Sequence, residues 1–309
     1  MNKNIAFVVV FHNAASFAPR VLEKVIQVAE SADEIVVIAD GCTDTTSKIC
    51  RELLTQSCKP FQFKETEDLH EIGALNVAFD LIETADFILH LQGDMVMDAQ
   101  TFPIVRDLLS QNLDIGVLSL RMGGCFHSDD LALELNEMNF GHNFKGRLRR
   151  KIKVNTYEYC VAGRGPLLFN RQILKSNNGQ IDINLKPHSI DDVDMSLISL
   201  ELGFKNYAVN LPYRSDITWG ATRSKNRSFL EPVQIAAEKN LLYVKEKHSK
   251  LLTNIAHSHK HSISELGTVK VGIYFMLGLY INRELLHSEN KLFKRLRRKI
   301  AFTLSQLTI

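Results

Sequence analysis

Short apolar runs alternate with amphipathic stretches through the first half of the chain, and this alternation restricts the possible folds more than any other feature. Runs of strand length lie at 5–11, 34–39 and 86–91, and each is apolar almost throughout, as in strands buried on both faces. The stretch 70–83 instead places its apolar residues at helical spacing. Strands and helices that alternate in this way form βα units, so we predict an α/β fold with a doubly wound, mainly parallel sheet.

The other predicted elements continue this pattern as far as residue 209. Further strands are expected at 61–63, 115–120, 167–169 and 204–209, and helices at 16–30, 44–54, 100–111 and 191–202. The polar stretch 121–155 fits neither pattern, and we expect it to be mobile. Beyond residue 228 only helical spacing remains. We therefore predict a catalytic domain over 1–227 and a C-terminal helical region over 228–309.

Charge and cysteine content limit the partners and the compartment. The net charge of +2 is too small for a protein that coats nucleic acid, so no nucleic-acid partner is expected. The five cysteines form no Cys-x-x-Cys pair, which argues against a disulfide framework and a zinc knuckle. No signal peptide is visible, and the late apolar run 271–281 is shorter than the ~20 residues of a spanning helix. We expect a cytoplasmic protein.

Polar residues gather directly after the predicted strands. The segments 12–13, 40–44 and 92–94 each follow a strand, and the acidic segment 191–194 begins a late helix. Ligands of open α/β sheets bind beyond the carboxyl ends of the strands. These four segments therefore predict the functional site.

Two common nucleotide-binding motifs are absent there. A dinucleotide-binding fold needs Gly-x-Gly-x-x-Gly after its first strand, where residues 11–15 contain no glycine. The stretch 141–148 approaches a P-loop but lacks its lysine and its hydroxyl residue. Acidic strand ends favour instead a divalent cation that is held by a carboxylate and bound to a diphosphate, with a second carboxylate free to accept a proton.

Five segments, taken in order, resemble the family 2 glycosyltransferases over about residues 5–210. They are VVVFHN at 8–13, IVVIADGCTDTT at 35–46, GALN at 73–76, ILHLQGD at 88–94 and DDVDM at 191–195. The resemblance implies a GT-A fold and an inverting hexosyltransferase. Such an enzyme would transfer a sugar from a UDP-linked donor to a glycan or a lipid-linked acceptor in polysaccharide or glycoconjugate biosynthesis.

The same resemblance implies roles for individual residues. Asp94 matches the metal-binding aspartate, which would hold Mn²⁺ or Mg²⁺, and Asp192 matches the catalytic base, with Asp191 as its acidic neighbour. Asp40 matches the aspartate that hydrogen-bonds the nucleotide base. Nucleotide-sugar contacts are implied at Val10, His12, Asn13, Asp40, Asn76, Gln92 and Gly93. Acceptor contacts are implied at Gly163, Arg164, Gly165 and Trp219.

Departures from the family pattern keep other interpretations open. Gln92 replaces the first acid of the Asp-x-Asp metal motif, Ala39 replaces the first acid of an Asp-Asp pair, and Glu71 replaces a lysine. A degenerate binding or scaffold subunit without transfer activity is therefore an alternative. A sugar-1-phosphate nucleotidyltransferase fits less well, since its glycine-rich basic loop after the first strand is absent. Locally, Asp40 could be a turn residue and the acids of 191–194 could stabilise a helix start.

The C-terminal segment 291–307 has the pattern of a helix that lies on a membrane surface. Leu292, Leu296 and Ile300 share one face, and six Lys and Arg residues occupy the other. We expect this helix to bind an anionic membrane surface, which would make the protein peripheral on the cytoplasmic face. A helix that packs on the catalytic domain is the alternative. The basic run 147–153 is either solvated surface or a flexible loop near an anionic diphosphate.

Overall fold

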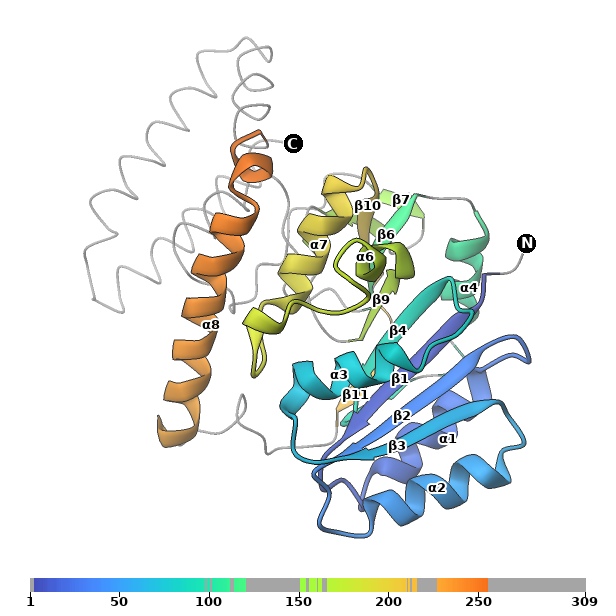
Figure 1. Ribbon diagram of the computed structural model, residues 1–309. Helices are drawn as coiled ribbons and strands as arrows, with labels where there is room; N and C mark the ends of the chain where they lie inside the picture. The colour runs from blue at the N-terminus through green and yellow to red at the C-terminus, as the bar shows by residue number, and fades with distance from the viewer. Residues whose placement is uncertain are drawn as a thin grey trace, which may run out of the picture. The chain divides into compact units, whose positions relative to one another are not determined.

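A nine-stranded sheet organises the protein in the computed structural model (Figure 1). The chain divides into two compact units, Met1–Leu252 and Thr253–Ile309. The structure describes residues 3–97, 99–100, 102–111, 114–120, 151–153, 156–159, 161–162, 166–209, 211, 213–215 and 227–254. Most of the stretch that was predicted to be mobile lies outside these residues.

The large sheet has the strand order β3-β2-β1-β4-β9-β6-β10-β8-β7. Its strands are β1 Ile5–Phe11, β2 Glu34–Asp40, β3 Phe61–Thr66, β4 Phe87–Gln92, β6 Ile115–Ser119, β7 Lys151–Lys153, β8 Thr156–Tyr159, β9 Leu167–Asn170 and β10 Lys205–Val209. The run from β3 to β4 is parallel, whereas β9 is antiparallel to both of its neighbours, β4 and β6. β5 Met95–Met97 and β11 Tyr213–Ser215 form a separate antiparallel pair.

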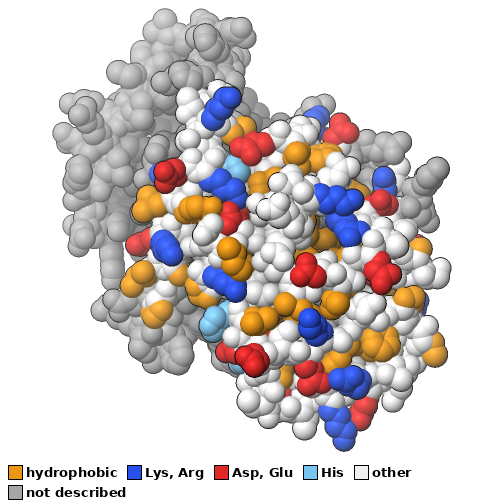
Figure 2. Space-filling view, viewed as in Figure 1, with side chains coloured by type: hydrophobic (Ala, Val, Ile, Leu, Met, Phe, Trp, Pro, Cys, Tyr) orange, Lys and Arg blue, Asp and Glu red, His pale blue; other side chains and the backbone are white. Residues whose placement is uncertain are grey.

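Helices connect and cover the strands. They are α1 Ala18–Val28, α2 Thr46–Gln56, α3 His70–Asp80, α4 Phe102–Ser110, α6 Arg171–Lys175, the short 3-10 helix η1 Ile183–Leu185, α7 Asp191–Glu201 and α8 Arg227–Lys247. None of the helices in the described part of the chain is long and apolar enough to cross a membrane. Acidic and basic side chains are interspersed over the face of the described residues drawn in Figure 2, in keeping with the small net charge.

The central strands β1, β2 and β4 are buried on both faces, which explains why they are so apolar. Alternate residues of β1, such as Phe7 and Val9, belong to one core cluster together with residues of α1, α2 and α4. The intervening Val8 is equally buried but lies outside that cluster, because successive strand residues point to opposite faces. Helix α3 contacts β1 and β2, and α7 contacts β6 and β10. The predicted doubly wound, mainly parallel sheet is confirmed.

Strand directions bring the start of α7 to the same edge as the ends of β1, β2 and β4. Because β4 and β6 are both antiparallel to β9, they run parallel to each other, and β10 runs parallel to β6. Helix α7 ends just before β10 begins, at the edge where β10 and the other parallel strands start. Its first residue therefore lies at the opposite edge, where the parallel strands end. This topology gathers the polar segments that the sequence singled out.

Most predicted elements are present, and the differences involve short or late ones. The predictions omitted the pair β5 and β11 and the short strands β7 and β8, which are too brief to show a periodic pattern. The first compact unit extends to Leu252 and includes α8, which makes polar contacts with the segment that contains α7. The domain boundary at residue 227 stays a prediction.

Candidate functional site

A hydrogen-bond relay fixes the loop that follows β1. The Asn13 Oδ1 accepts from the Thr43 N–H at 2.8 Å, the Thr43 hydroxyl at 3.1 Å and the Asp44 N–H at 3.3 Å. These donors fix the orientation of the Asn13 amide, so its Nδ2 donates to His12 Nε2 at 3.3 Å. His12 then carries its proton on Nδ1, which donates to the Asp40 carbonyl oxygen at 2.8 Å. One imidazole tautomer is thereby selected.

Asp40 at the end of β2 is buried, and one of its carboxylate oxygens already accepts hydrogen bonds. Its Oδ1 accepts from the Thr66 hydroxyl at 2.8 Å and from the Leu69 N–H at 2.9 Å. The next residue, Gly41, has a φ of 56°, and a Cβ there would lie 2.7 Å from the Asp68 Cβ. Asp40 is therefore more than a turn residue, because its carboxylate anchors the segment that leads into α3.

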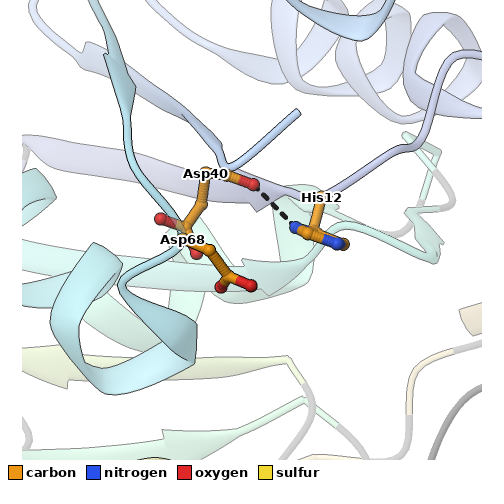
Figure 3. Close-up of side chains that lie close together, drawn as sticks. All are labelled: His12, Asp40 and Asp68. Carbon is orange, nitrogen blue, oxygen red and sulfur yellow. Dashed lines mark hydrogen bonds between the residues drawn. The ribbon is translucent and has the colours of Figure 1, made fainter. Parts of the chain in front are cut away.

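His12, Asp40 and Asp68 converge at this edge, with Asp68 reaching in from the segment ahead of α3 (Figure 3). One potential ligand atom from each lies within 4.8 Å of the others. A cation would nevertheless have to displace a hydrogen bond from either His12 nitrogen, because Nδ1 donates to Asp40 and Nε2 accepts from Asn13. Asp68 also contacts the His70 Nδ1 at 3.2 Å. The three side chains therefore form a polar wall that suits a hydrogen-bonding ligand better than a bare cation.

The end of β4 lies against the end of β1 through a glycine. A Cβ on Gly93 would lie 2.6 Å from the Val10 carbonyl oxygen and 2.9 Å from the Phe11 ring. Only a residue without a side chain fits at that distance. Gln92 and Asp94, on either side of it, are both half-buried. Close packing against β1 thus requires glycine at position 93, and the nucleotide contact predicted for Gly93 stays a prediction.

We predict that Gly93→Ala destabilises the protein by about 1–3 kcal/mol, the usual cost of forcing extra atoms into a packed site. The added Cβ would push the end of β4 away from β1. Urea unfolding measures the change in the free energy of unfolding. Gln92→Ala is the matched control, since it alters the neighbouring residue but removes atoms instead of adding them. Equal stability of Gly93→Ala and wild type would contradict the close approach.

The three acids at the start of α7 occupy different environments. Asp191 is buried and Asp192 is half-buried, and the Asp192 Oδ1 accepts from the Val193 N–H at 3.0 Å. Asp194 is buried and binds Lys247 Nζ at 2.9 Å and His248 Nε2 at 2.8 Å, the last residue of α8 and the residue after it. Asp194 is therefore a structural ion-pair residue, which leaves Asp191 and Asp192 as the acidic pair at the sheet edge.

The charged contacts around Asp194 are mutually stabilising. Burial lowers the pKa of His248, but hydrogen bonds to Asp194 and Glu201 outweigh it, so the pKa is raised overall. Burial also lowers the pKa of Lys247, and its bonds to Asp182 and Asp194 again raise it overall. These contacts therefore favour the charged forms of both side chains next to α7.

Helix α3 joins the polar residues at the end of β2 to the segment that precedes the acidic pair. The Ile72 N–H donates to the Pro187 carbonyl at 3.3 Å. The buried Asn76 donates to the Ile181 carbonyl at 2.9 Å and accepts from the Ile181 N–H at 2.8 Å. The Asn76 amide thus holds the segment that precedes α7, and the nucleotide contact predicted for Asn76 stays a prediction.

Several predicted site residues cannot be placed. Gly163, Arg164, Gly165 and Trp219 lie outside the described residues, as do the basic run at 147–150 and the C-terminal segment 291–307. Sequence reasoning also missed the polar residues of α8. Asn240, Lys247 and His248 bind the α7 segment, yet the sequence shows only that this region is helical. Their partners are backbone carbonyls and a distant carboxylate, which no local pattern reveals.

A comparison of the sequence with known protein families identifies the family of this chain. The chain matches the model of glycosyl transferase family 2 over residues 6–175, which is more than half of its length. The chain belongs to this family. It is therefore a glycosyltransferase, as the five segments predicted. No curated protein was found to match it.

Solved structures that resemble this family 2 glycosyltransferase share its fold at low identity. The mannosyltransferase PcManGT from Pyrobaculum calidifontis, in complex with GDP-Man and Mn²⁺, is 14% identical with a TM-score of 0.52, covering 99% of this chain and 86% of that one. TarS from S. aureus is 16% identical with a TM-score of 0.50, covering 70% of this chain and only 37% of that one. A TarS structure in complex with UDP-GlcNAc is 16% identical with a TM-score of 0.51, covering 90% of this chain and 81% of that one. The predicted GT-A fold is confirmed.

Proposed function

We propose that the protein is an inverting glycosyltransferase that moves a hexose from a UDP-linked donor to the hydroxyl of a glycan or lipid-linked acceptor. The observation that carries the proposal is the placement of separate acids at one sheet edge. Asp40 ends β2, Asp94 follows β4, and the pair Asp191 and Asp192 begins α7. Base recognition, cation binding and proton acceptance need separate carboxylates, and this edge offers one for each.

The donor lies along the edge in this proposal. Asp40 accepts a hydrogen bond from the nucleotide base, with His12 and Asn13 beside it. Asp192 accepts the proton of the acceptor hydroxyl as that oxygen attacks the anomeric carbon from the face opposite the leaving diphosphate, which inverts the configuration. Its half-buried position beside the more buried Asp191 suits this role, since a general base must reach the acceptor.

Asp94 fits a cation that is shared with the donor. Among the described residues, Asp94 belongs to no group of three His, Cys, Asp or Glu side chains close enough to share an ion. Mn²⁺ and Mg²⁺ are commonly held by one or two carboxylates together with substrate phosphates, so a single aspartate beside a diphosphate is a sufficient protein ligand set. A cation bound there supplies charge neutralisation of the leaving diphosphate.

A ligand screen by thermal shift tests the donor class. Binding to the folded state raises the melting temperature by mass action, so UDP with Mn²⁺ should raise it more than GDP, CDP or Mn²⁺ alone. GDP-Man and UDP-GlcNAc occupy the related structures, and both sugar nucleotides belong in the screen. A coupled assay for nucleotide release then reports turnover. Binding without release or transfer would instead support the alternative of a degenerate binding subunit.

We also propose that the C-terminal segment holds the enzyme on the cytoplasmic face of an anionic membrane. Each basic residue near such a surface contributes about 1 kcal/mol, and the contribution falls as salt rises. We predict that the full chain co-sediments with anionic vesicles at low salt, and that a chain ending at Ser288 does not. Neutral vesicles are the control. Equal sedimentation of both chains would make the segment a packing element and remove the main support for a lipid-linked acceptor.

A further inference from the structure

Helix α8 contacts the active-site segment through a buried asparagine. Asn240 is 1% exposed, and its Nδ2 donates to the carbonyls of Leu185 at 2.7 Å, His188 at 3.0 Å and Ser189 at 3.1 Å. Turning the amide over would place its oxygen against these three acceptors, so its orientation is fixed. Figure 1 shows α8 running alongside α7, whose first residue follows this loop directly.

The loop that Asn240 holds contains two successive residues with a strained backbone. Ser189 has a φ of 81° and Ile190 a φ of 69°, so two successive residues that carry side chains adopt left-handed conformations. A β-branched residue such as Ile190 rarely does so. Conformations of this kind persist only where the surrounding structure imposes them, and they concentrate at functional sites.

The strained turn determines where the acidic pair begins. Ile190 is the residue before α7, and its carbonyl accepts the Asp194 N–H at 3.0 Å, which starts the helix. Asp191 and Asp192 follow at once. If the turn relaxed, the first residues of α7 would move with it, and the Asp192 carboxylate would leave the position from which it meets the acceptor.

We propose that Asn240 is a positioning residue, which holds the Ser189–Ile190 turn in its left-handed form and thereby sets Asp192 for proton acceptance. This inference rests on the proposed function, because it assigns Asn240 to the same transfer reaction. It predicts that Asn240 acts on turnover and has little effect on donor binding, since Asp40 and Asp94 lie on other elements.

Other contacts of α8 provide a matched control. The Tyr243 hydroxyl donates to Asp182 Oδ2 at 2.8 Å and accepts from the Asn184 amide at 3.1 Å. These bonds attach α8 to the segment near η1 but not to the strained turn. Tyr243→Phe therefore weakens the attachment of the helix without removing the donor that the turn requires.

The experiment compares Asn240→Leu, which has similar volume but no donor, with Tyr243→Phe in the full chain. We expect Asn240→Leu to lower kcat by about 10- to 100-fold, the usual cost of a misplaced catalytic group, with KM for the donor and Kd for UDP within about twofold of wild type. Tyr243→Phe should keep kcat near wild type. In the Asn240→Leu background, Ser189→Gly should recover part of the lost kcat, because glycine adopts a positive φ without strain.

Hydrogen exchange of the amides at 188–194 provides a readout that does not depend on turnover. These amides should exchange faster in Asn240→Leu than in Tyr243→Phe. Unchanged kcat in Asn240→Leu, or an equal loss in Tyr243→Phe, would overturn the proposal. If wild type itself transfers no sugar from any nucleotide donor, the proposed function fails, and the exchange rates alone decide whether Asn240 holds the turn. If Asn240→Leu does not fold, Asn240→Ser takes its place in the same comparison.

Discussion

Replacing Asp192 by Asn is expected to lower sugar transfer by about two to four orders of magnitude, the usual contribution of a positioned general base. The amide cannot accept the proton of the acceptor hydroxyl, whereas its size and shape are nearly those of the carboxylate. UDP binding should stay close to wild type, since Asp40 and Asp94 are unchanged. The measurements are kcat for transfer and Kd for UDP by titration calorimetry.

Asp191 and Asp194 are neighbouring carboxylates, and replacing each of them by Asn provides matched controls for Asp192→Asn. Asp194→Asn removes a buried partner of Lys247 and His248, so it should cost stability, by about 3–5 kcal/mol, while the folded fraction keeps most of its turnover. Asp191→Asn tests which residue of the pair Asp191 and Asp192 is the general base. If Asp191→Asn abolishes transfer and Asp192→Asn does not, the two roles are exchanged. If neither variant loses activity, the acids stabilise the start of α7 and the catalytic proposal is wrong.

The sheet could be predicted from sequence because its central strands are buried on both faces. The run 5–11 is short, uninterrupted and rich in β-branched and aromatic residues, which favours a buried strand, and the helices between the strands have clear helical spacing of their apolar residues. The polar ends of these strands could then be assigned to one edge, since parallel strands end together. The order of the strands and the antiparallel β9 could not be read in this way, because they depend on pairing between distant segments.

The parts of the site that sequence missed depend on contacts to backbone atoms. The GALN segment gives no sign that Asn76 binds the backbone of Ile181, which lies far along the chain. Asn240 lies on a helix whose spacing shows only which residues are apolar. The left-handed φ of Ile190 could not be predicted either, because isoleucine rarely adopts this conformation and nothing in the local sequence indicates it.

In the proposed function a single acid, Asp94, holds the cation, because Gln92 stands in the place of a second acid. An amide oxygen can approach a cation but brings no negative charge, so the protein alone should bind Mn²⁺ weakly at this edge. The diphosphate of the donor brings that charge. Cation and nucleotide binding should therefore be mutually dependent, each strengthening the other by the same factor.

Asp94→Asn is accordingly expected to abolish the Mn²⁺ dependence of UDP binding and to remove transfer, because Gln92 provides no second acid to compensate. Thermal shift and calorimetry with UDP, Mn²⁺ and both together measure the dependence. Asp68→Asn is the matched control, since Asp68 belongs to the other group of potential ligands, with His12 and Asp40. If Mn²⁺ no longer strengthens UDP binding in Asp68→Asn but still does so in Asp94→Asn, the cation binds at the polar wall formed by His12, Asp40 and Asp68. Loss of the Mn²⁺ effect in Asp94→Asn alone would place the cation at the end of β4, where Gly93 packs against β1 and the diphosphate would supply the ligands that the protein lacks.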